Sequence, residues 1–160
     1  MKKILNQTLV LKPENSKTNV PLSFSLEKDY ERLFIRYRYF PKKVEDMDQA
    51  KREILQALEK YVPEESRAAY SGWRDYAPLV NLVTLSLDYE KEYLGCAHRH
   101  APEQKHIISA AGSSPGFVPH PAAAGNWKIV LNVHAIIGNP VTCQVEVIGL
   151  EKGEAPDDSI

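Results

Sequence analysis

Hydrophobic and polar positions alternate most regularly between Trp127 and Ala135. With a period of two, one face is apolar and consists of Trp127, Ile129, Leu131, Val133 and Ala135. The other face is mostly polar and begins at Lys128. We therefore predict a strand that turns one face into the core, with Trp127 as the first core residue on that face.

A loop rich in proline and glycine precedes this strand and begins at Ser114. Proline fixes φ and lacks a backbone donor, so the loop cannot pair as a central strand. A second alternating run follows at Val141 to Leu150. A long loop that crosses between two sheets and leads into two successive strands is typical of a double-sheet sandwich or jelly roll. We call this loop the crossing loop.

The same alternation predicts the other strands. They are Thr8 to Leu11, Val20 to Leu26, Leu33 to Tyr39, Leu79 to Leu87, Glu92 to His100 and His106 to Ala110. Together with the two runs above they make about eight strands, the number that a jelly roll uses. We predict an all-β, jelly-roll-like β-sandwich.

One helix interrupts this β pattern. Between Asp46 and Val62 the apolar residues recur at three- and four-residue steps, and Pro63 follows. Asp46 and Gln49 have the spacing of a capping box. We predict an inserted α-helix near 46–62 that lies over one edge or mouth of the sandwich, where it would cover exposed strand groups.

Length and composition indicate one domain. The 160 residues suffice for a single hydrophobic core, which we assign to residues 1–150. The last ten residues, 151–160, are charged and poor in apolar side chains, so we expect a disordered tail.

Net charge, apolar run length and cysteine content indicate which partners and which compartment to expect. There are 20 basic and 21 acidic residues, a formal net charge of -1, so we expect no nucleic-acid partner. No apolar run approaches the length of a membrane span, and the N-terminal segment lacks a cleavage site, so we expect a cytoplasmic protein without membrane contact. The two cysteines, Cys96 and Cys143, would then be buried, reduced thiols. A protein or small-molecule partner and a homo-oligomer both stay open.

A row of arginines follows one face of the third strand. Arg32, Arg36 and Arg38 alternate with apolar residues there, interrupted on their own face by Phe34. The row suggests a ligand site. The ordinary alternative, which we favour, is a solvated face whose arginines pair with carboxylates on a neighbouring strand.

One group of residues could bind a metal. On the strand that ends at His100, a period of two places Cys96, His98 and His100 on one face, and His134 lies on the polar face of the later strand. Zinc takes three or four such nitrogen and sulfur ligands. The alternative is a set of hydrogen-bonded structural histidines, which we favour because the chain has no CxxC or HExxH motif.

Three segments resemble a known family. They are NLVTLSLDY with GCAHRH in 81–100, ISAAGSSPGFVPHPAAAGNWKIVLNVHAI in 108–136, and CQVEV in 143–147. The short pieces SPGF, PHP and GNW occur in the family's order, at 114–117, 119–121 and 125–127. This half of the chain is similar to the N-terminal β-sandwich domain of the CehA/McbA-like metallohydrolases, in which a catalytic PHP domain follows.

The resemblance implies an accessory domain and brings no catalytic residue. Only the tail follows Leu150, and the helix from Asp46 has no place in the family pattern. We therefore expect a non-catalytic binding module without a cofactor. The alternative is a small zinc-dependent hydrolase that uses Cys96, His98, His100 and His134.

Overall fold

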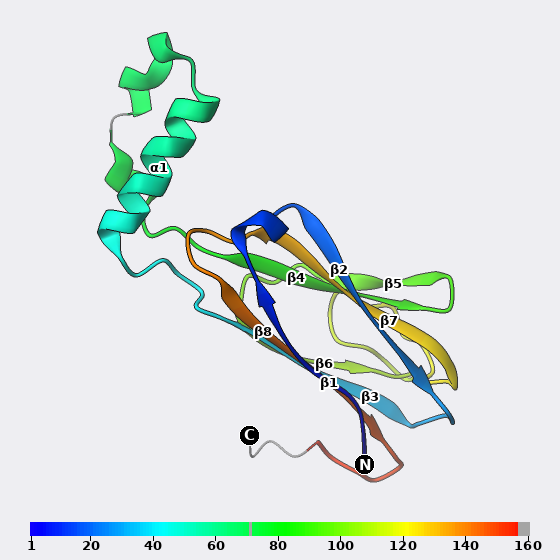
Figure 1. Ribbon diagram of the computed structural model, residues 1–160. Coiled ribbons are helices and arrows are strands. Elements are labelled where there is room, and N and C mark those ends of the chain that lie inside the picture. Colours follow the sequence, from blue (N-terminus) through cyan, green and yellow to red (C-terminus); the bar gives the residue numbers. More distant parts are fainter. Residues whose placement is uncertain (71, 157–160) are drawn as a thin grey trace.

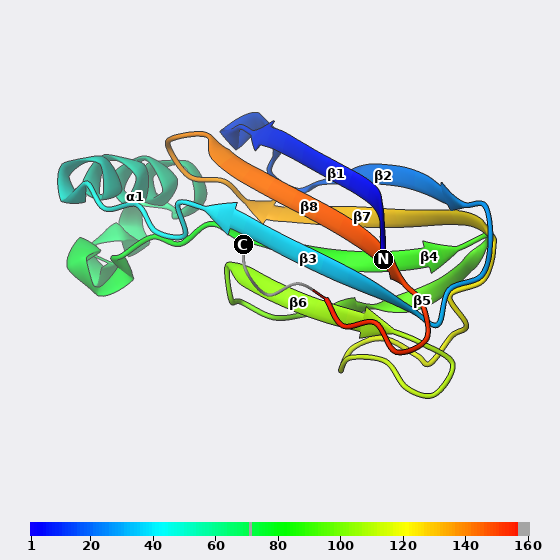
Figure 2. The same cartoon turned by 90° about the horizontal axis from the view of Figure 1, so that it is seen from below.

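The computed structural model describes residues 1–70 and 72–156 as two antiparallel four-stranded sheets packed face to face (Figures 1 and 2). The first sheet has the order β1 (Lys2–Leu11), β8 (Val141–Leu150), β3 (Arg32–Phe40), β6 (Glu103–Ile108). The second has the order β2 (Thr18–Leu26), β7 (Gly125–Ala135), β4 (Leu82–Tyr89), β5 (Glu92–Ala97). The predicted all-β sandwich is confirmed.

The core lies between the inner faces of the two sheets. Trp127 is 1% exposed, and Ile129, Leu131 and Val133 are buried as predicted, whereas Ala135 at the end of β7 is only half-buried. Leu131 pairs with Leu85 of β4, and Ile129 with Leu87, so the two central strands of the second sheet present one apolar surface. Tyr37 of β3 lies opposite in the core and donates a hydrogen bond across the sandwich to the Val83 carbonyl at 2.8 Å.

Several strand boundaries differ from the prediction. β1 begins at Lys2 rather than Thr8, because a bulge between Lys3 and Leu5 interrupts the alternation there. β6 begins at Glu103 rather than His106, since Gln104 and His106 are the polar residues on its inner face. β5 ends at Ala97 rather than His100, so the period-two argument does not hold beyond that residue.

The inserted helix is α1 (Met47–Tyr61), as predicted. The Asp46 carboxylate caps it by accepting hydrogen bonds from the backbone N–H groups of Asp48 and Gln49 at 2.9 and 3.0 Å. Short 3₁₀ turns follow at η2 (Glu64–Tyr70) and η3 (Trp73–Tyr76); another, η1 (Pro13–Asn15), joins β1 to β2. We call residues 47–76 the helical arm. The arm projects from one end of the sandwich and does not lie along an edge (Figure 1).

A short antiparallel ladder closes the base of the helical arm. The Asn81 N–H donates to the Lys42 carbonyl at 2.8 Å, and the Val44 N–H donates to the Leu79 carbonyl at 2.9 Å. The buried Asn81 side chain also accepts from the Ile137 N–H at 2.8 Å and donates to the Pro41 carbonyl at 2.9 Å. The two ends of the arm are therefore held together next to the sandwich.

The crossing loop before β7 lies against β5, which is an edge strand. The Cys96 N–H donates to the Gly116 carbonyl at 3.0 Å, and the Val118 N–H donates to the Leu94 carbonyl at 2.9 Å. The loop thus occupies backbone groups that an edge strand would otherwise expose.

The chain after β8 folds back toward the N-terminus. The Glu154 carboxylate pairs with the Met1 amino group, and its carbonyl accepts from the Arg32 guanidinium. Residues 157–160 of the predicted tail, 151–160, lie outside the described residues.

Candidate functional site

Three of the four predicted metal ligands lie on the outer face of the second sheet. Cys96 on β5 and His134 on β7 flank the central strand β4, and His98 follows the end of β5. The Cys96 Sγ lies 3.8 Å from His98 Nδ1. His100 is exposed beyond the strand end and makes none of the cluster's hydrogen bonds within the described chain. The structure thus places Cys96, His98 and His134 on one face of the sheet and leaves His100 apart from them.

Two neutral side chains complete this polar cluster. Thr84 Oγ1 lies 3.0 Å from His134 Nε2 and accepts from the Cys96 thiol at 3.9 Å. The Asn132 amide donates to Cys96 Sγ at 3.8 Å. Sequence reasoning missed Thr84, although it lies between the buried apolar residues of β4, and it placed Asn132 on an exposed face. Asn132 is half-buried because these groups surround it.

The side chains of this cluster are held by hydrogen bonds to one another. Burial raises the pKa of the Cys96 thiol, and the hydrogen bond with Thr84 opposes that shift. A protonated thiol is a poor nucleophile and a poor metal ligand. Across residues 1–70 and 72–156, no three His, Cys, Asp or Glu side chains are placed to hold a metal ion. Cys143 is buried in the core, and both cysteines are free thiols.

His106 belongs to the core and not to this cluster. It is 1% exposed on the inner face of β6, with its ring edge-on to Phe117 at 5.2 Å between centroids. The Gln104 amide donates to the carbonyls of Arg99 and Ala101, so its oxygen faces His106 Nε2 at 3.0 Å and accepts from it. This arrangement fixes the neutral Nε2–H tautomer.

His106 should make stability depend on pH. Burial, assisted by the charge of Arg99, lowers the pKa of His106 to about 4 from its ordinary value of 6.5. The unfolded chain therefore binds the proton first as the pH falls. We expect the free energy of unfolding to decrease by about 2 kcal/mol between roughly pH 8 and pH 5 through this residue. Urea melts across this range measure it; His106→Gln should flatten the profile, and an equal slope in both proteins would contradict the assignment.

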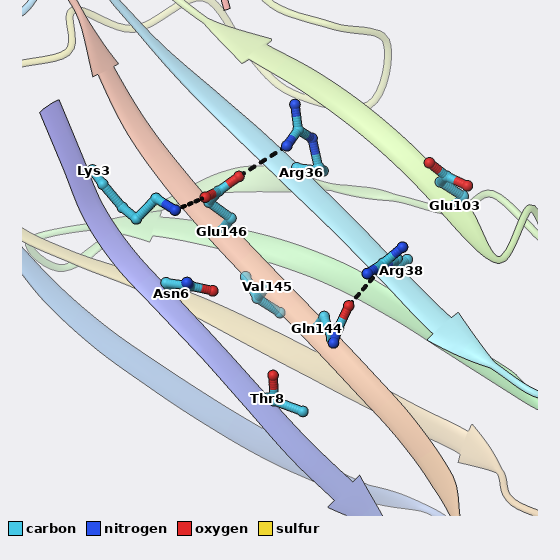
Figure 3. Close-up of a pocket in the computed structure, with 9 residues that line it drawn as sticks. All are labelled: Lys3, Asn6, Thr8, Arg36, Arg38, Glu103, Gln144, Val145 and Glu146. Atoms are coloured by element: carbon cyan, nitrogen blue, oxygen red, sulfur yellow. Dashed lines mark hydrogen bonds and ion pairs between the residues drawn. The ribbon is translucent and has the colours of Figure 1, made fainter. Parts of the chain in front are cut away.

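Arg36 and Arg38 of the arginine row lie on the outer face of the first sheet and line a cavity of about 300 Å³, whereas Arg32 donates to the Glu154 carbonyl and is not part of the lining (Figure 3). Arg36 Nη1 is 3.1 Å from a Glu146 oxygen, and Lys3 Nζ is 2.6 Å from the other oxygen. Arg38 donates instead to the neutral Gln144 amide oxygen. The expected pairing with carboxylates on a neighbouring strand is thus found for Arg36.

The register places these side chains in two rows across the sheet. Arg36 pairs with Glu146, which pairs with Asn6; Arg38 pairs with Gln144, which pairs with Thr8. All six residues line the cavity, and Glu103 of β6 stands beside Arg38 in the second row. The face therefore offers charged and neutral hydrogen-bonding groups side by side.

A second and mostly apolar cavity lies where the helical arm meets the sandwich. We call it the arm groove; its volume is about 490 Å³. Its lining comes from α1, η3 and the loops at this end: Pro13, Glu53, Ile54, Ala57, Leu58, Tyr61, Val62, Tyr76, Leu79, Ile136, Ile137 and Gly138. Ile54 is buried in it, whereas Tyr61 is 67% exposed and Tyr76 45% exposed.

The helical arm carries further exposed apolar surface. Ala50 and Ile54 are the buried residues of α1, whereas Met47 and Leu55 are each close to half exposed. None of the helices in the described parts of the chain is long and apolar enough to cross a membrane.

Comparison of the chain with protein-family models, with curated proteins and with solved structures gave no match.

Proposed function

We propose that this protein is a non-catalytic binding module, and that the arm groove takes an apolar segment of a partner protein. The observation that carries the proposal is the groove itself, about 490 Å³ of apolar space with exposed tyrosines at its mouth. A cavity of this size and lining suits large hydrophobic anchors. The resemblance to an accessory β-sandwich domain agrees with such a role.

The lining also favours a particular chemistry of partner. Glu53 is the one charged side chain in the groove lining among the described residues. An amphipathic segment with two apolar anchors and a neighbouring lysine or arginine would fill the groove and pair with Glu53. Pairing at the rim would add specificity more than affinity.

Selection of short peptides displayed on phage would test this proposal. We expect the selected peptides to combine large apolar residues with a basic one, and to lose binding to Ala57→Glu, which places a carboxylate in the groove. Gln56→Glu is the matched control, because it adds the same charge at the adjacent exposed position of α1 outside the groove. Peptides that bind both variants equally would contradict the proposal, as would a selection that enriches no peptide.

Two finer assignments accompany the proposal. The strand order is β1-β8-β3-β6 in the first sheet and β2-β7-β4-β5 in the second. In each sheet, early strands of the chain lie next to late ones, and this arrangement supports a jelly-roll topology. Two free cysteines support a reducing compartment, and we infer the cytoplasm.

A zinc-dependent hydrolase is the second candidate, favoured by the 3.8 Å between Cys96 Sγ and His98 Nδ1. Zinc needs three or four ligands, whereas Thr84 holds His134 at 3.0 Å. We therefore expect well under one zinc per chain when protein purified without an affinity tag is analysed for metals. Stoichiometric zinc that disappears in His98→Ala or His134→Ala would overturn the non-catalytic assignment.

A further inference from the structure

Arg38 lies on the outer face of the first sheet and has no ion-pair partner among the described residues. Glu146 is shared by Lys3 and Arg36, at 2.6 and 3.1 Å, so this carboxylate is already occupied and the three groups together keep a charge of +1. Arg38 has no carboxylate within ion-pair distance among residues 1–70 and 72–156; its Nε donates to the neutral Gln144 oxygen. Arg38 lines the cavity of about 300 Å³ (Figure 3), and its two terminal nitrogens make no hydrogen bond to other described residues.

Two neutral side chains on β1, across β8 from Arg38, have no hydrogen-bond partner among the described residues (Figure 3). The Asn6 amide and the Thr8 hydroxyl line the same cavity, and neither side chain makes a hydrogen bond in the part of the chain that the structure describes. An amide and a hydroxyl offer both donors and acceptors, which is what ligand hydroxyl groups require. A planar guanidinium recognises a carboxylate through two parallel hydrogen bonds.

We propose that this face binds a small ligand that carries one carboxylate flanked by hydroxyl groups, as in a sugar acid, with the carboxylate on Arg38 and the hydroxyls on Asn6, Thr8 and Gln144. The cavity is at the lower end of the usual size for small-molecule sites and suits a single sugar ring. Glu103 and Glu146 line it as well and would repel a ligand with several negative charges. This distribution favours one carboxylate over a phosphate.

Titration with D-glucuronate at low salt, followed by the backbone amide signals in NMR spectra, tests the inference. We expect shifts confined to β1, β3 and β8, and tighter binding than for glucose, acetate or inorganic phosphate. Loss of a charged hydrogen-bonding partner should weaken glucuronate binding about tenfold in Arg38→Gln. Arg74→Gln, a matched change on the exposed helical arm, should leave the affinity unchanged.

Other results would overturn it. Acetate binding as tightly as glucuronate would remove the role of the hydroxyls, and glucose binding as tightly would remove the role of the carboxylate. Tighter phosphate binding, or equal affinity in Arg38→Gln, would show that Arg38 does not select a carboxylate. The Ala57→Glu protein should bind glucuronate with unchanged affinity. The glucuronate test can therefore fail while the peptide test of the arm groove succeeds, and the reverse.

Discussion

Replacing Trp127 with alanine is expected to lower the free energy of unfolding by about 3 to 5 kcal/mol, through lost burial and the cavity left behind. The indole is 1% exposed and packs against Tyr89 at 4.7 Å and Phe24 at 6.3 Å between ring centroids. Its N–H also donates to the Ala123 carbonyl at 3.0 Å, which ties the crossing loop to the core. Denaturant melts measure the loss.

Ser23→Ala is the control for Trp127→Ala. Ser23 is exposed on β2 and pairs with Lys128, the residue after Trp127. Its substitution should change the stability by no more than about 0.5 kcal/mol. If Trp127→Ala were equally mild, the indole would not be a core residue and the inward face of β7 would be wrong.

Gly95→Ala is expected to be comparably severe, because there is no space for a methyl group. A Cβ at Gly95 would lie 2.1 Å from the Gly116 carbonyl oxygen, and the φ of +127° disfavours any L side chain. We expect a loss of roughly 3 to 5 kcal/mol, from backbone strain of about 1–3 kcal/mol and about 1 kcal/mol for each loop hydrogen bond that is displaced. Thermal and denaturant melts both report it.

Gly112→Ala is the matched control, at a glycine between β6 and the crossing loop. A Cβ at Gly112 would meet nothing within 4 Å, so this variant should stay within about 0.5 kcal/mol of the wild type. A Gly95→Ala protein as stable as the Gly112→Ala protein would mean that the crossing loop does not lie against β5 as described.

Alternation and helical periodicity predicted most of this fold. β7 and α1 were found because each has one continuous apolar face and a clear ending, at Ala135 and before Pro63. The start of β6 was missed because Gln104 and His106 share a hydrogen bond inside the core, so polar residues occupy inward positions. Local patterns do not reveal such pairs.

The surfaces were less predictable, since each is assembled from distant segments. The arm groove needs Pro13, Leu58 and Ile137 to meet, and no period in the sequence relates them. The Cys96 cluster was partly foreseen, because strand alternation puts Cys96 on the face opposite Ala97. Its contact with His134 through Thr84 depends on the order of three strands, which sequence patterns did not give.

The ladder at the base of the helical arm has a consequence for how this protein can diversify. Lys42 and Asn81 are joined by a backbone hydrogen bond of 2.8 Å, so the segment between them enters and leaves the sandwich at one point. The entropic cost of closing such a loop rises slowly with its length. Insertions, deletions or a wholly different sequence between Val44 and Leu79 would leave the pairing of all eight strands intact. The sequence of the helical arm, and with it the choice of partner, can thus change during evolution without changes in the core residues.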